Sequence, residues 1–353
     1  MRYQNLFFLL FVFLLSANLA FAQQQKPTPT PVPSPSPEVI IEDDEPLKVD
    51  ADLVNITFTA ADKERRFVTN LTKDDVKILE DGQPQQIFTF EKQISLPLSL
   101  AIIIDTSASQ ERTLPEEKRA AQSFLENVVR PNKDEVAVLS FTGETTLEQS
   151  LTGNMARLRR AIDNVQFVAP SGYIGGGVTV GTPPISGRSQ TVAGSTAVWD
   201  ALWVTSDEVL REAPQGTRRA IILLSDGVNT FGSKRIDDAV EQALKADAII
   251  YCVGIGDDYF NGVDKGSLNK IAERTGGRAY FPRDERDLQR AFEQIQDDLR
   301  SQYLIAYAPS NEKKDGSYRK IEIQVTNSAL EKQKVKLVHR QGYFAQNGTP
   351  AKK

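Results

Sequence analysis

Cysteine and histidine are almost absent from this chain, which has one of each in 353 residues. The single cysteine, Cys252, excludes an intramolecular disulfide, and its place in the apolar stretch 248–253 favours a buried structural thiol over a reactive one. The single histidine, His339, lies in a strand pattern near the C-terminus. It offers too little for a Ser-His-Asp hydrolase or a histidine-rich zinc site, so the sequence indicates a protein that is not an enzyme of these classes.

The chain also lacks a surplus of positive charge. It has 42 Lys and Arg against 47 Asp and Glu, which gives a formal net charge of −5, and it shows no basic stripe interleaved with aromatic residues. This pattern argues against nucleic acid as a partner. The content of 40% hydrophobic and 25% charged residues is ordinary for a globular protein.

A long apolar run occurs near the N-terminus, over residues 6–15, directly after Met1, Arg2 and three further residues. The sequence Ala20-Phe21-Ala22 then has the small-x-small pattern of a cleavage site, so residues 1–22 are predicted to be a secretory signal peptide. An uncleaved membrane anchor is the alternative, although the run is short for a membrane span. We therefore expect an exported protein, periplasmic, cell-surface or extracellular, with no stable membrane span after cleavage.

Proline is concentrated in residues 23–46, which begin QQQKPTPTPVPSPSP. Such a segment cannot build a core and favours extended polyproline II, so we interpret it as a linker between the cleavage point and the folded body. The last residues, 346–353, are predicted to be a disordered tail.

Short strands with alternating side chains are expected on both sides of a central region. In the N-terminal β segment, 47–96, they are residues 54–59, 76–79 and 87–90, with an Asp81-Gly82 hairpin signal. In the C-terminal β segment, 301–345, they are residues 303–307, 318–325 and 335–340. Neither half has enough strands to be stable alone, so we expect one β-sandwich built from both.

Residues 97–300 alternate strands with helices, which predicts an α/β fold with a doubly wound, mostly parallel sheet. The expected strands are residues 98–104, 135–141, 219–224, 248–253 and 278–281. The expected helices are residues 115–129, 155–165, 196–212, 235–245, 268–275 and 287–299.

Polar side chains follow two of these strands and precede one helix. Asp105, Ser107 and Ser109 come after the first strand, Asp226 comes after another, and Thr196 opens a helix. Parallel sheets place ligand sites beyond the carboxyl ends of their strands, and hard cations such as Mg²⁺ prefer oxygen ligands. Taken singly, each segment is also typical of a turn or a helix cap. Their combination at one sheet edge favours a metal site.

With these motifs, residues 97–300 resemble the von Willebrand factor type A family. The metal-ion-dependent adhesion site of that family has an Asp-x-Ser-x-Ser loop, a Thr from a second loop and an Asp from a third. These match Asp105, Ser107 and Ser109, then Thr196, then Asp226. The resemblance implies Mg²⁺ or Mn²⁺ held by Ser107, Ser109 and Thr196, with Asp105 and Asp226 contributing directly or through water.

Two positions depart from the family pattern, which often has Gly where Ala108 stands and Met where Gln110 stands. The second departure affects the packing expected behind the loop. The order of signal peptide, β segment, type A domain and β tail ending in Arg340-Gln-Gly-Tyr343 looks like a group of secreted bacterial proteins with a type A-related domain.

The function expected from this resemblance is metal-dependent protein binding or adhesion, in which a carboxylate of a protein partner completes the coordination of the cation. The alternatives are a structural exported protein with a vestigial metal site and a metal-assisted hydrolase, for which no general base or nucleophile is evident. The Gly- and Pro-containing segment 167–193 leads to Thr196 without a helical pattern. We interpret it as a rim that selects the partner, with a floppy insertion as the alternative.

Overall fold

The computed structural model describes residues 53–92, 96–169, 195–256 and 262–346. The chain divides into two compact units, Met1–Asp50 and Ala51–Lys353, and all the described residues belong to the second. The predicted signal peptide and linker, most of the segment 167–193 and the C-terminal tail lie outside the described residues, so these predictions stay as they were. The same holds for the predicted boundaries between the domains.

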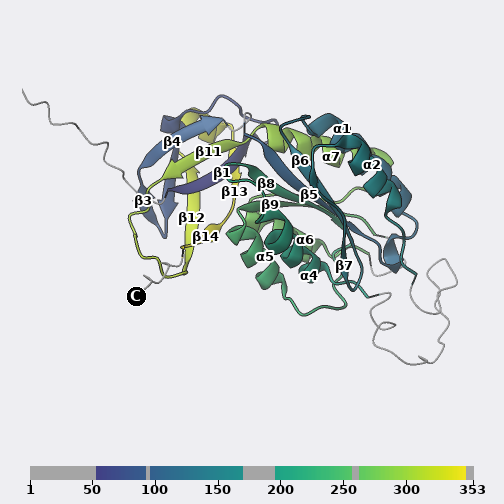
Figure 1. Ribbon diagram of the computed structural model, residues 1–353. Helices are drawn as coiled ribbons and strands as arrows, with labels where there is room; N and C mark the ends of the chain where they lie inside the picture. Colours follow the sequence, from purple (N-terminus) through teal and green to yellow (C-terminus); the bar gives the residue numbers. More distant parts are fainter. Residues whose placement is uncertain (1–52, 93–95, 170–194, 257–261, 347–353) are drawn as a thin grey trace, which may run out of the picture. The chain divides into compact units, whose positions relative to one another are not determined.

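The central sheet has six strands in the order β10-β9-β8-β5-β6-β7 (Figure 1). Strand β5 pairs in parallel with β6 and β8, strand β9 pairs in parallel with β8 and β10, and β7 runs antiparallel to β6. All eight residues of β5 are buried, as expected for the middle strand of a sheet covered on both faces. The predicted doubly wound, mostly parallel sheet is confirmed. The strands are β5 (Leu98–Asp105), β6 (Glu135–Phe141), β7 (Thr145–Thr152), β8 (Arg218–Ser225), β9 (Ala248–Gly254) and β10 (Ala279–Tyr280).

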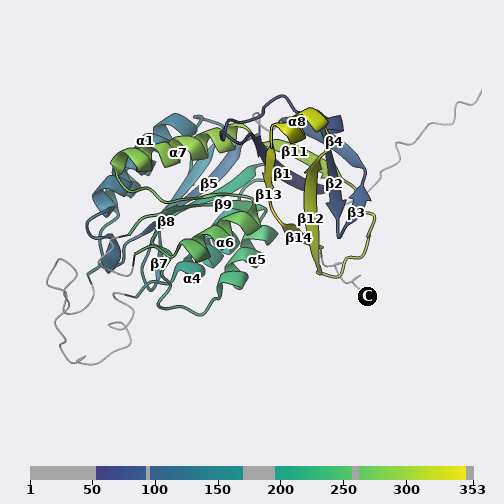
Figure 2. The same ribbon diagram turned by 180° about the vertical axis from the view of Figure 1, so that it is seen from behind.

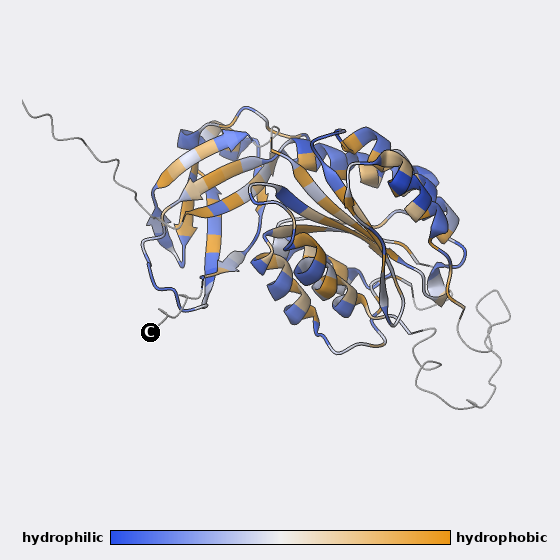
Figure 3. Cartoon of the chain, viewed as in Figure 1, coloured by the Kyte–Doolittle hydropathy of each residue, from blue (hydrophilic) through white to orange (hydrophobic). Residues whose placement is uncertain are grey.

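Helices cover both faces of this sheet (Figures 1 and 2). One face carries α1 (Leu114–Val128), α2 (Met155–Asn164) and α7 (Glu285–Arg300), and the other carries α4 (Val198–Val204), α5 (Ile236–Lys245) and α6 (Lys265–Thr275). Alternate side chains of β5 supply the two cores, because Ile102 and Ile104 pack on the first face and Ile103 on the second. The apolar strands are thus enclosed between the helices (Figure 3).

The segment 196–212 is not one regular helix. It forms α4 and then a π-helical turn, Thr205–Leu210. The hydroxyls of Thr205 and Ser206 donate hydrogen bonds to the carbonyls four residues before them, at 2.7 and 2.8 Å. Such bonds compete with the regular backbone pattern, which gives a local reason for the change in helix type.

A β-sandwich is formed by both ends of the described chain, as predicted. Its sheets have the orders β13-β1-β11-β4 and β14-β12-β2-β3. A turn forms at Asp81-Gly82 as predicted, and both residues have positive φ, 48° and 80°. The predicted hairpin between residues 76–79 and 87–90 is wrong, however, because the turn joins β2 to β3, and residues 87–92 lie in the other sheet. Strands β3 and β14 and helix α8 were not expected from the sequence. The elements are β1 (Val54–Ala61), β2 (Val76–Glu80), β3 (Gln83–Gln85), β4 (Ile87–Lys92), β11 (Tyr303–Tyr307), β12 (Tyr318–Val325), α8 (Ser328–Lys332), β13 (Lys336–His339) and β14 (Gly342–Phe344).

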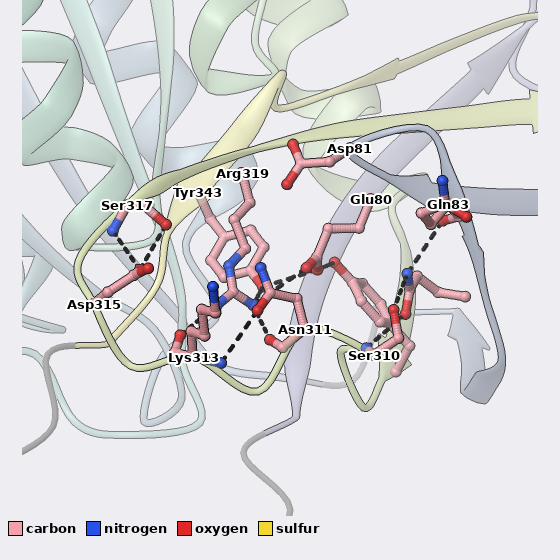
Figure 4. A network of polar contacts seen from close by, with 12 residues as sticks. Glu80, Asp81, Gln83, Ser310, Asn311, Lys313, Asp315, Ser317, Arg319 and Tyr343 are labelled. Atoms are coloured by element: carbon pink, nitrogen blue, oxygen red, sulfur yellow. Dashed lines mark hydrogen bonds and ion pairs between the residues drawn. The ribbon is translucent and has the colours of Figure 1, made fainter.

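A buried polar network crosses the sandwich (Figure 4). Arg319 donates to Glu80 Oε1 at 3.2 Å and to the hydroxyl of Tyr343 at 3.3 Å, and it also donates to the carbonyls of Asn311 and Lys313. The other oxygen of Glu80 accepts hydrogen bonds from the hydroxyls of Tyr307 and Tyr343. Because a buried ion pair is stable only when its remaining hydrogen bonds are made, this network fixes the loop before β12 onto both sheets.

Two consecutive glycines allow close backbone approaches, the first to the sandwich and the second within the α/β region. Gly276 ends α6 with a φ of 87°, and a Cβ there would lie 2.5 Å from the backbone nitrogen of Arg340. A Cβ on Gly277 would lie 2.0 Å from the carbonyl oxygen of Ile250. Larger residues do not fit at either position. The contact at Gly276 and the residues that line a shared cleft place the sandwich against the edge at which β9 and β8 begin. None of the helices in the described residues is long and apolar enough to cross a membrane.

Candidate metal centre

Asp105 is the last residue of β5 and lies at the carboxyl edge of the sheet, between the ends of β6 and β8. Its side chain is fully buried. One carboxylate oxygen accepts a hydrogen bond from the backbone nitrogen of Ser107 at 2.9 Å, and the other accepts one from the hydroxyl of Ser225 at 2.6 Å. The carboxylate is therefore held rigidly by the loop that follows it and by the neighbouring strand.

Ser107 and Ser109 point toward one another, because their hydroxyl oxygens lie 3.2 Å apart. Gln110 follows them and is fully buried. Its side-chain nitrogen donates to the carbonyl of Ile255 at 3.0 Å and lies 3.4 Å from the hydroxyl of Ser109. Gln110, which stands where the family often has Met, therefore connects the loop after β5 to the segment after β9 through this hydrogen bond.

Asp226 directly follows β8 and is buried. Its carboxylate accepts a hydrogen bond from the backbone nitrogen of Val228 at 2.9 Å. Burial raises the pKa of Asp226, and a hydrogen bond from the hydroxyl of Ser109 lowers it, so the Ser109 hydroxyl lies beside the Asp226 carboxylate. The structure therefore brings Asp105, Ser107, Ser109 and Asp226 together.

Gly256 makes room for Asp226, and sequence reasoning missed this role. A Cβ on Gly256 would lie 2.8 Å from the Cβ of Asp226. The available signal was the pair Gly254 and Gly256 directly after an apolar strand, which indicates a close backbone approach but not what approaches.

Thr196 is held at the same edge through its backbone. Its nitrogen donates to the hydroxyl of Thr230 at 2.8 Å, and its carbonyl accepts from the backbone nitrogens of Thr230 and Phe231. The next residue, Ala197, donates to the carbonyl of Thr142 at the end of β6. Ala197 is the N-cap of α4, so the interpretation of Thr196 as a simple helix cap is wrong. Within the described residues the Thr196 hydroxyl makes no hydrogen bond with the other four predicted ligands, so its side chain is the least constrained of the set.

Negative charge accumulates at this edge. Burial, and then the charge of Asp226, raise the pKa of Asp105 to about 7. Burial is also the main cause that raises the pKa of Asp226. Among the ion pairs of residues 53–346 that the structure describes, none involves Asp105 or Asp226. Two neighbouring carboxylates without a basic partner are the electrostatic condition that a cation would relieve.

A third carboxyl group, Glu117, is close enough to interact with Asp105 and Asp226 and was missed by sequence reasoning. It lies on α1, is fully buried, and neither of its carboxylate oxygens has a hydrogen-bond partner. Burial raises the pKa of Glu117 to about 8, and the charges of Asp105 and Asp226 raise it further in the same direction. The signal was present in the sequence, because Glu117 interrupts the apolar face of α1 formed by Leu114, Ala121 and Phe124.

The donor set fits a hard divalent cation. It consists of carboxylate and hydroxyl oxygens, and the orphaned oxygens of Glu117 lie in a region that lacks positive charge. A cluster of three or more His, Cys, Asp and Glu residues placed to hold a metal is not found in the described part of the chain. Three of the five predicted ligands, Ser107, Ser109 and Thr196, are hydroxyl residues and do not count toward such a cluster.

Comparison with protein families identifies the central region. Two models, both described as von Willebrand factor type A domain, match residues 100–229 and residues 185–294. The chain is therefore a von Willebrand factor type A domain protein. This family supports a metal-dependent adhesion or protein-binding module in general and divalent metal binding in general. A search of curated proteins gives no match.

Solved structures with similarity include proximal thread matrix protein 1 from the mussel byssus, with 20% identity, a TM-score of 0.45 and coverage of 63% of this chain and 51% of that chain. The same mussel protein with a zinc-occupied MIDAS motif gives 19% identity, a TM-score of 0.46 and coverage of 62% and 49%. The conserved hypothetical protein BatB from Bacteroides thetaiotaomicron gives 15% identity, a TM-score of 0.42 and coverage of 59% and 100%. The match spans about half the length of the mussel protein.

Proposed function

We propose that this protein is an exported, metal-dependent protein-binding or adhesion module and not an enzyme. Ser107, Ser109 and Thr196 would hold Mg²⁺ or Mn²⁺, and Asp105 and Asp226 would contribute directly or through water. The observation that carries this proposal is the cluster of buried carboxylates and serine hydroxyls at one sheet edge, with no basic side chain paired to the carboxylates in the described residues.

The cation would supply a coordination position that an acidic side chain of a protein partner can occupy, because hydroxyl ligands leave its charge partly uncompensated. Two exposed apolar side chains support a protein partner. Val168 is 40% exposed and its backbone nitrogen donates to the carbonyl of Thr106. Phe231 is 43% exposed and its backbone nitrogen donates to the carbonyl of Thr196. Both lie beside the predicted ligands, where they can contact apolar residues next to the partner's carboxylate. We propose that the segment 167–193 adds to this rim.

Export is supported by the apolar run and the Ala20-Phe21-Ala22 pattern at the N-terminus. The non-catalytic assignment is supported by the positions of the two residues most often used in catalysis. His339 lies in β13 of the sandwich, where Nε2 faces the backbone nitrogen of Ile323. Cys252 is fully buried in β9, and burial raises the pKa of its thiol far above the ordinary range. Neither contacts the acidic edge.

Thermal unfolding with and without millimolar Mg²⁺ or Mn²⁺ tests the metal site. A ligand that binds the folded state at tenfold excess over its Kd stabilises that state by about 1.4 kcal/mol. We expect the natural protein to show this gain and Ser109→Ala to lose it, because Ser109 is one of the proposed hydroxyl ligands. Ser123→Ala, which removes an exposed hydroxyl from α1, is the matched control and should respond like the natural protein.

The two alternatives make different predictions. A vestigial site predicts no response to either cation in any of the three proteins. A metal-assisted hydrolase predicts metal-dependent turnover of ester or phosphoester substrates that disappears in Ser109→Ala. Partner capture should be compared with and without a chelator, and capture that is insensitive to the chelator would contradict the proposed mode of binding.

A further inference from the structure

A second candidate binding site lies where the sandwich meets the α/β region. It is a cleft of about 180 Å³. This is room for several water molecules or one small anion. Its walls come from β1 and β11, from the beginnings of β8 and β9, and from the segment after β13; the residues that matter here are Asn55, Arg218, Arg219, Asp247 and Arg340. The cleft adjoins the strand beginnings and the metal edge adjoins the strand ends, so the two sites occupy opposite edges of one sheet.

The charge lining the cleft is strongly positive. The lining contains three arginines and one acidic residue, Asp247. Asp247 forms an ion pair with Arg340. Arg218 donates to the carbonyl of Leu299 and to the side-chain oxygen of Gln302, which are neutral acceptors. Arg219 likewise donates only to carbonyls, those of Ala246 and Ala213, at 3.3 and 3.0 Å. Within the described residues, two guanidinium groups at this cleft therefore have no carboxylate partner.

The arginine cluster also retains unused donors. The Nε–H groups of Arg218, Arg219 and Arg340 are buried and make no hydrogen bond. Burial, and then the charge of Arg130, lower the pKa of Arg218 to about 10, which is the response expected of a guanidinium in a positive and poorly solvated environment. An anion in the cleft would supply the missing negative charge to the guanidinium groups that line it.

We propose that this cleft is an oxyanion site that binds phosphate or a carboxylate. The planar guanidinium fork matches both groups and can bind them through two hydrogen bonds at once. The site is independent of the metal edge, so it requires neither Mg²⁺ nor the residues Asp105 and Asp226. The ligand could be a free anion or an acidic group presented by a larger molecule, and the shared chemistry is the oxyanion.

Thermal unfolding of the full chain, dialysed free of divalent metals, tests this proposal. Sodium phosphate, sodium acetate and sodium chloride are compared at equal ionic strength. At tenfold excess over Kd, a bound oxyanion should raise the midpoint by about 2 °C for a protein of this size. A saturable rise with phosphate alone assigns a phosphate site, and a rise with acetate alone assigns a carboxylate site. No rise beyond chloride with either anion overturns the proposal.

Two variants keep the test specific. Arg219→Gln should abolish the response, whereas Arg159→Gln, which changes an exposed arginine on α2, should leave it intact. Asn55→Asp is the second variant, because Asn55 is exposed, lines the cleft, and accepts a hydrogen bond from Arg340 through its carbonyl. We expect this built-in carboxylate to remove the response to added anions and to raise the midpoint in chloride. An undiminished anion response in both Arg219→Gln and Asn55→Asp would show that binding occurs elsewhere.

Discussion

Glu117→Gln is the most informative single substitution, because it removes a buried ionisable group and keeps the shape of the side chain. In the metal-free protein the pKa of Glu117 is about 8, against 4.5 for an exposed glutamate. The folded state therefore keeps its proton over a pH range in which the unfolded state has lost it. For an acid whose pKa is higher in the folded state, the free energy of unfolding is greatest at a pH below the pKa of the unfolded state. It decreases as the pH rises from the unfolded-state pKa to the folded-state pKa.

The magnitude follows from the two pKa values. At about 1.36 kcal/mol for each pKa unit, Glu117 lowers the free energy of unfolding by about 1 kcal/mol at pH 5 and by about 3 kcal/mol at pH 7. With roughly 2.1 cal/mol/K of unfolding entropy per residue over roughly 300 residues, about 3 kcal/mol corresponds to about 5 °C in midpoint. Glu117→Gln should therefore unfold about 5 °C higher than the natural protein at pH 7 and within about 2 °C of it at pH 5.

The assay is thermal unfolding between pH 5 and pH 8 in metal-free buffer. Glu116→Gln, at the neighbouring and partly exposed position on α1, is the matched control and should follow the natural protein. Added Mg²⁺ should narrow the gap between natural protein and Glu117→Gln, because a nearby cation favours the ionised carboxyl group. Parallel curves for the natural protein and Glu117→Gln across this pH range would refute the reasoning.

Three further substitutions test other parts of the structure. Asp105→Asn removes a carboxylate whose charge is unfavourable in a buried position, so calorimetry at pH 8 should show no loss of stability in the metal-free protein. The same variant should show no stabilisation by Mg²⁺, and a retained stabilisation would contradict the assigned site. Tyr343→Phe should lower the free energy of unfolding by about 1–3 kcal/mol in urea, since it leaves buried partners unsatisfied, whereas the exposed Tyr318→Phe should change it by less than about 0.5 kcal/mol. Gly277→Ala should cost at least about 2 kcal/mol in urea unfolding because its Cβ overlaps a carbonyl, whereas Gly266→Ala inside α6 should stabilise by up to about 1 kcal/mol; equal effects would show that the close approach is not there.

The fold could be predicted because its strands have strong and distinct patterns. Strand β5 has an apolar stretch, interrupted only by Ser99, that ends in Asp105, and the parallel strands beside it repeat this pattern. Strand β7 was not predicted, because its sequence TTLEQSLT is mostly polar and lies partly exposed at the sheet edge. Its position depends on pairing with β6, which is a tertiary contact that local sequence does not encode.

The site could be predicted in part for a related reason. Asp105 and Asp226 directly follow buried strands, so the topology of a parallel sheet places them at one edge. Glu117 comes from a helix, and its approach to these carboxylates depends on how α1 packs. The fit of Gly256 against Asp226 likewise depends on two segments that are far apart in sequence. Such contacts follow from packing rather than from residue order, so periodicity alone could not reveal them.

The pairing of the sandwich explains how the acidic edge remains available to a partner. Strand β11 lies between β1 and β4, and β12 lies between β2 and β14, so the two ends of the described chain complete both sheets. This sandwich lies at the edge where β8 and β9 begin, as the contact of Gly276 with Arg340 and the cleft at Arg218 and Arg219 indicate. The carboxyl edge with Asp105 and Asp226 is at the other end of the same strands, so the sandwich does not cover it.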